Sequence, residues 1–87
     1  MPITKQITEI ILKNIPDATA IVTDPQQDGV HFQALVISAT FIGMPLVKQH
    51  QMVLNSLKEA FKEKVHALAL KTFTPEKWES QKENYSV

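Results

Sequence analysis

The chain lacks two residue types that carry much of protein recognition chemistry, because it has neither cysteine nor arginine. Without cysteine, it can form no disulfide and no zinc–thiolate site from its own side chains. All nine of its basic residues are lysines, which excludes bidentate guanidinium contacts to phosphate or guanine. Nine acidic residues balance the lysines, so the formal net charge is zero and tight nucleic-acid binding is not expected.

Long apolar runs are also absent. No stretch approaches the ~20 apolar residues that a membrane-spanning helix needs. The first residues, MPITK, do not follow a signal-peptide pattern. We therefore expect a soluble cytoplasmic protein without membrane contact. The length of 87 residues suits one small core, and we predict one domain over residues 1–80 and a polar tail over residues 81–87.

The first half of the chain predicts a helix followed by two strands. Isoleucines recur at helical spacing over residues 4–14, and Pro16 prevents the helix from continuing. Residues 18–23 and 30–39 are rich in β-branched and other apolar side chains. Residues 24–29 contain Asp-Pro and Asp-Gly steps, which form turns, so the two strands are expected to make an antiparallel hairpin.

A long helix is predicted from residue 46 over roughly eighteen residues. Gly43 precedes it and is expected to take a positive φ as a structural residue of the connection. The spacing of the apolar positions predicts one buried stripe on this helix, made of Leu46, His50, Val53, Leu54, Leu57 and Phe61.

The last part of the chain predicts a third strand and a short helix. The strand covers residues 66–73, and Thr74 caps the helix, with Pro75 in its first turn. Trp78 is expected to close this helix onto the sheet, and the polar residues beyond it are expected to fray. The element order is α-β-β-α-β-α, which predicts an α+β domain with a three-stranded mixed sheet covered by helices.

The three histidines are the residues that carry candidate chemistry. No catalytic triad, carboxylate pair or phosphate-binding loop is present, so we do not expect an enzyme. His66 opens the third strand and His31 follows the turn, so each is a candidate metal ligand, although a packed strand-end role also fits. His50 lies in the predicted stripe and is assigned to structure. A zinc site made of two or three histidines is a remaining alternative.

Several sequence strings resemble the BolA family. They are His31-Phe32, Phe41-Ile42-Gly43, the segment 47–51, and the segment 66–78 from its histidine through Thr-Pro-Glu-Lys-Trp. The resemblance extends from about residue 7 to residue 78. It implies a fold similar to class II KH domains and a role in handling iron–sulfur clusters.

The resemblance also implies a partner and a set of ligands. In such pairs a monothiol glutaredoxin and its glutathione hold one iron of a shared [2Fe–2S] cluster, and the BolA-type protein supplies nitrogen to the other. His66 corresponds to the family ligand at the start of the third strand. The second family ligand is a Cys or His in or just after the first hairpin loop. Since residues 24–29 contain neither, His31 is assigned this role.

Two other functions compete with this one. The first is a KH-like, nucleic-acid-binding transcriptional regulator, and the second is an interaction domain without metal. KH domains clamp nucleic acid with a Gly-x-x-Gly loop, whereas residues 41–45 contain one glycine and a proline. We therefore expect weak or no nucleic-acid binding. The isolated protein is expected to be a monomer or a weak dimer.

Overall fold

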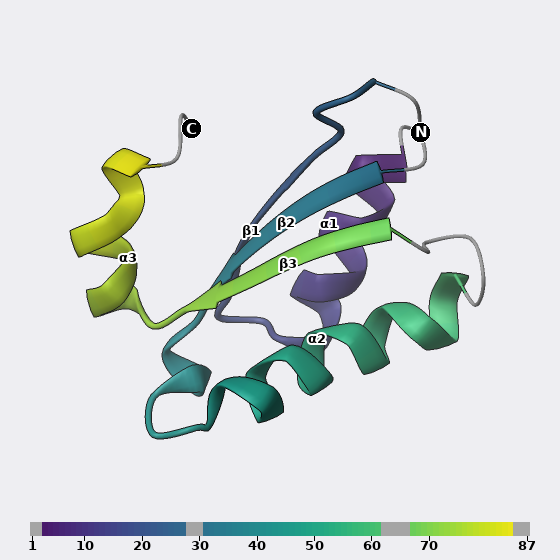
Figure 1. Cartoon of the computed structure of the whole chain (residues 1–87). Helices are drawn as coiled ribbons and strands as arrows, with labels where there is room; N and C mark the ends of the chain where they lie inside the picture. Colours follow the sequence, from purple (N-terminus) through teal and green to yellow (C-terminus); the bar gives the residue numbers. More distant parts are fainter. Residues whose placement is uncertain (1–2, 28–30, 62–66, 85–87) are drawn as a thin grey trace.

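The computed structural model describes residues 3–27, 31–61 and 67–84. It confirms the predicted α+β class and the order of elements (Figure 1). The helices and strands are α1 (Ile3–Asn14), β1 (Thr19–Thr23), β2 (His31–Ile37), the 3-10 turn η1 (Ala39–Phe41), α2 (Leu46–Phe61), β3 (Ala67–Phe73), α3 (Pro75–Gln81) and the 3-10 turn η2 (Lys82–Asn84).

The sheet has the strand order β1-β2-β3 and is mixed, as predicted. β1 pairs antiparallel with β2, and β2 pairs parallel with β3. Parallel neighbours need a crossover connection, and α2 is the main part of it. Because β2 and β3 run in the same direction, both begin at the same edge of the sheet (Figure 1). At this edge His31 is paired with Ala67.

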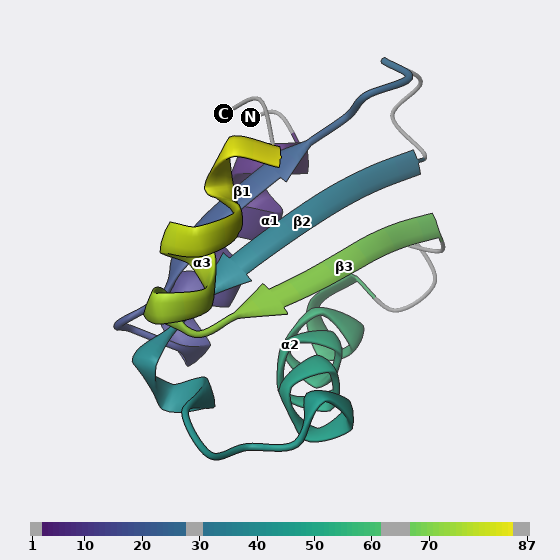
Figure 2. The same cartoon turned by 60° about the vertical axis from the view of Figure 1, so that its left-hand side comes forward.

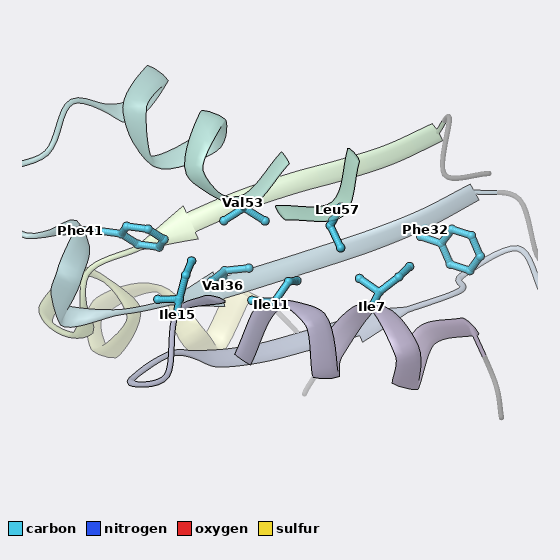
Figure 3. Packing of buried hydrophobic residues seen from close by; sticks show 8 residues of the cluster. All are labelled: Ile7, Ile11, Ile15, Phe32, Val36, Phe41, Val53 and Leu57. Atoms are coloured by element: carbon cyan, nitrogen blue, oxygen red, sulfur yellow. The ribbon is translucent and has the colours of Figure 1, made fainter. Parts of the chain in front are cut away.

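One face of the sheet is covered by α1 and α2 (Figures 1 and 2). Alternate residues of β2 point to this face, as the twofold repeat of a strand requires. The side chains converge between the two helices and the sheet (Figure 3). Each fully buried aliphatic or aromatic side chain stabilises the fold by about 1.5–3 kcal/mol. The core consists of Ile7, Ile11, Ile15, Phe32, Val36, Phe41, Val53 and Leu57.

The opposite face of the sheet carries α3. The Thr74 hydroxyl accepts a hydrogen bond from the Lys77 N–H, and Pro75 begins the helix. The rings of Phe73 and Trp78 lie 5.4 Å apart between centroids, tilted by 55°. Trp78 packs against a second buried cluster, formed by Leu35, Ile37 and Phe73. The prediction that this tryptophan closes the helix onto the sheet is confirmed.

Helical structure continues further past Trp78 than the polar sequence suggested. α3 extends to Gln81, and η2 follows to Asn84. An exposed ion pair of 2.7 Å joins Lys82 to Glu79, although such pairs contribute little to stability. β2 in turn ends earlier than predicted, because Ser38 caps η1 by accepting a hydrogen bond from the Thr40 N–H.

The predicted stripe of α2 was wrong at two positions, since Leu46 and Leu54 are exposed. The buried residues of the described part of α2 are instead Gln49, Val53 and Leu57, at steps of four. Successive side chains of an α-helix are rotated by about 100° around its axis. Leu54 therefore points well away from the core that buries Val53, the residue before it. The side chain of Phe61 lies outside the described residues.

The polar residue Gln49 can occupy the buried face of α2 because its side-chain amide has hydrogen-bond partners there. Its amide nitrogen donates hydrogen bonds to the carbonyl oxygens of Met44 at 2.8 Å and Phe41 at 3.4 Å. Its amide oxygen accepts a 2.7 Å hydrogen bond from the Thr72 hydroxyl. The glutamine therefore ties α2 to β3 and to the connection before α2, where Gly43 takes the expected positive φ of 77°.

Replacing Gln49 with leucine should lower the free energy of unfolding by about 1–3 kcal/mol, because buried polar groups lose their partners. Gln51 is exposed on the same helix, and Gln51→Leu is the matched control, with a change within about 0.5 kcal/mol. Urea unfolding, monitored by circular dichroism, measures the free energy of unfolding of both variants. Equal effects of the two substitutions would contradict the assigned role of Gln49.

Asp17 joins the connection after α1 to the start of η1. The Ser38 hydroxyl donates to its carboxylate at 2.8 Å, the Ala39 N–H donates at 3.0 Å, and the Thr40 hydroxyl donates at 2.9 Å. The hydrogen bonds from Ser38, followed by those from Thr40 and Ala39, hold the pKa of Asp17 below its ordinary value of 3.8. The carboxylate form therefore stabilises the fold.

This lowered pKa predicts a pH-dependent effect of Asp17→Asn. The stabilisation is complete above the ordinary value of 3.8 and disappears as the pH falls through the lower pKa of the folded state. Thermal unfolding should therefore show a lower Tm for the variant at neutral pH and a shrinking difference in acid. The control is Glu9→Gln, at an exposed carboxylate of α1. A Tm difference that stays constant into acid would count against this account.

Candidate functional site

His31 is the first residue of β2, and its side chain is exposed. The next residue, Phe32, is 2% exposed and packs in the core with α1 and α2. Because successive strand side chains point to opposite faces, His31 lies on the face away from these two helices. The exposed position of His31 is compatible with binding a metal that a partner protein presents.

A shallow depression lies beside His31, with a volume of about 600 Å3. The turn after β1 contributes to it, together with the first residues of β2 and β3. It therefore forms at the edge where the two parallel strands begin. The residues that line it are Pro25, Gln26, His31, Phe32, Gln33, Leu68 and Ala69.

His66, the other predicted ligand, lies outside the described residues. Its chain neighbour Ala67 is described, and it is the residue paired with His31 across the sheet. Neighbouring strands lie ~4.8 Å apart, so the residue that follows His66 in the sequence is within reach of His31. Within the described parts of the chain, no group of three or more His, Cys, Asp or Glu side chains is arranged to hold a metal ion.

His50 is half-buried on α2 and does not line the depression. Its assignment to structure remains a prediction. In the described part of the chain, no helix has the length and apolar character needed to cross a membrane.

Sequence reasoning missed the other residues of the depression. Gln33 follows His31 by two positions and therefore lies on the same face of β2. Ala69 is its partner across the sheet. The alternation along β2 was readable from the sequence, but the pairing with β3 was not, because the register of two parallel strands has no local sequence signal.

Comparison with known proteins identifies the family. The model of the BolA family, described as BolA-like protein, matches residues 5–77. The chain belongs to the BolA family. A BolA homologue from Coxiella burnetii has a solved structure that is 34% identical, with a TM-score of 0.74, and the match covers 87% of this chain and 95% of the other. BolA1 from Arabidopsis thaliana is 30% identical, with a TM-score of 0.73 and coverages of 84% and 92%.

Curated BolA relatives match over shorter segments. The DNA-binding transcriptional regulator BolA of Haemophilus influenzae is 42% identical over 53 residues, which cover 61% of this chain and 52% of the relative. BolA-like protein 2 of Mus musculus is 43% identical over 51 residues, with coverages of 59% and 58%. The chain thus spans about half the length of these relatives.

The exposed position of His31 predicts that the fold does not need its side chain. His31→Ala should change the free energy of unfolding by less than about 0.5 kcal/mol. Phe32→Ala, one residue further along β2, should cost about 3–5 kcal/mol because it empties part of the core. Chemical denaturation measures both variants. A large loss of stability in the His31 variant would mean that this histidine is structural.

Proposed function

We propose that this BolA-family protein is a cytoplasmic iron–sulfur cluster adaptor. It binds a monothiol glutaredoxin and shares with it a [2Fe–2S] cluster, to which His66 and His31 contribute imidazole nitrogen. It performs no catalysis of its own. The cluster is its cargo for assembly, transfer or iron and redox signalling.

The observation that carries the proposal is the place of His31 at the shared starting edge of β2 and β3. The strand register brings the residue after His66 opposite His31. When two imidazoles bind one iron, the two nitrogen atoms that bind it must lie within about 4 Å of each other. The described residue that follows His66, Ala67, is paired with His31, so the two histidines belong to segments that meet at this edge of the sheet.

The composition of the chain supports a cluster shared with a partner rather than a cluster bound by this chain alone. Iron in these clusters is held mainly by thiolate, and this chain has no cysteine. The cysteine of the glutaredoxin and the thiol of glutathione would provide the sulfur ligands. The residues of this chain would present neutral imidazole at the exposed end of the sheet, and the depression beside His31 offers open space for the partner.

The proposal predicts a new visible circular dichroism spectrum when the protein is mixed with a monothiol glutaredoxin, iron, sulfide and glutathione. His31→Ala and His66→Ala should each remove the new signal, because each takes away a ligand. His50→Ala is the control and should retain it.

The reference spectrum is that of the glutaredoxin homodimer with its own cluster. If the mixture gives only this spectrum, direct ligation by the BolA-family protein is wrong. If the new spectrum survives in both the His31 and the His66 variants, other ligands hold the cluster.

Nucleic-acid binding is a second candidate, because relatives such as that of Haemophilus influenzae are named DNA-binding transcriptional regulators. The zero net charge and the absence of arginine weigh against tight intrinsic binding. Fluorescence anisotropy with labelled DNA at about 150 mM salt separates the two functions. Submicromolar affinity of the protein alone would favour the regulator.

A further inference from the structure

A half-buried polar side chain, that of Gln33, lies beside His31. The two residues are two positions apart in β2, so their side chains stand on the same face of the sheet, ~7 Å apart along the strand. Figure 2 shows α3 over the opposite end of this face, where β2 and β3 end. Gln33 lines the depression at the open end.

The neighbours of Gln33 across the sheet leave room for its carboxamide. Ala69 is paired with it on β3, and Thr23 is paired with it on β1. Both neighbours are exposed, and the alanine has only a methyl group. The side chain of Gln33 can therefore turn toward the depression without displacing a large side chain.

The fold does not use the polar atoms of this carboxamide. Among the residues that the structure describes, none forms a hydrogen bond with it, whereas the carboxamide of Gln49 bonds to three groups. In the same part of the chain no buried side-chain nitrogen or oxygen lacks a partner, so the polar atoms of Gln33 reach solvent. Its two N–H donors are thus available to a molecule bound beside His31.

Neutral donors are the polar chemistry that the depression offers beside its imidazole. None of the described side chains that line it is a lysine, an aspartate or a glutamate. Its two carboxamides come from Gln26, in the exposed turn after β1, and from Gln33, which the sheet holds in register with β3. The sulfur atoms of an iron–sulfur cluster accept hydrogen bonds, and such bonds change its reduction potential.

We propose that the Gln33 carboxamide donates a hydrogen bond to a sulfur atom of the cluster bound by His31 and thereby raises the reduction potential of that cluster. The inference rests on the proposed function. A one-electron reductant adds one electron to the cluster and breaks no bond. The added negative charge falls partly on the sulfur atoms, so the N–H dipole stabilises the reduced form more than the oxidised form.

The test is a redox titration of the complex with a monothiol glutaredoxin and glutathione, using dithionite as the reductant and visible circular dichroism as the signal. Gln33→Leu removes the donors and breaks no hydrogen bond among the described residues. It should lower the midpoint potential by ~59 mV, which corresponds to a tenfold change in the ratio of reduced to oxidised cluster. The control is Thr23→Val, which removes a hydroxyl from the same face outside the depression and should leave the potential unchanged.

A second measurement distinguishes a hydrogen bond from a general change in polarity. Pulsed electron paramagnetic resonance of the reduced complex in D2O should show a coupling to an exchangeable deuteron that Gln33→Leu removes and Thr23→Val retains. If the new circular dichroism spectrum forms with both variants but their potentials and deuteron couplings equal those of the unchanged protein, the role of Gln33 is wrong and cluster sharing stands.

Two other outcomes would also overturn the inference. If folded Gln33→Leu fails to give the new spectrum, the residue is needed to form the complex and does not tune the cluster. If the unchanged protein gives no new spectrum, the proposed function is wrong, and the role of Gln33 fails with it.

Discussion

The parallel pairing of β2 with β3 is the interaction on which the candidate site depends. It brings the beginnings of two strands that are far apart in the sequence to one edge of the sheet. The register then places His31 opposite the residue that follows His66. A slip of one residue in β2 would turn His31 toward the α1/α2 side of the sheet and expose Phe32 instead. The core that holds Phe32 therefore also determines where His31 points.

The polar contacts that stabilise the fold are concentrated toward the other end of these strands. Thr72, which donates to Gln49, lies five residues beyond Ala67 along β3, or ~16 Å. Asp17 binds the segment that follows β2 directly. These hydrogen bonds and the candidate chemistry thus lie toward opposite ends of one sheet. At the end that carries His31, the buried ring of Phe32 stabilises the fold instead, on the other face of the strand.

The sequence was sufficient to predict the order of elements, the hairpin and the contact of Trp78 with the sheet, because periodicity, turn residues and caps are local signals. The prediction of the buried face of α2 was wrong, since counting apolar residues placed Leu54 in the core and overlooked Gln49. A glutamine becomes a core residue only when acceptors and donors from other segments surround it, and these come from the tertiary fold. His31 was proposed as a ligand from its place after the turn and from the family resemblance, whereas its partner across the sheet could be identified only from the strand register.

Pulsed electron paramagnetic resonance of the reduced cluster tests the central claim most directly. The complex would contain glutaredoxin, glutathione and the BolA-family protein labelled with 15N only at its histidines. The account predicts strong 15N couplings from two histidine nitrogens, one of which disappears when His31 is replaced. A cluster spectrum without 15N coupling from this chain would contradict it.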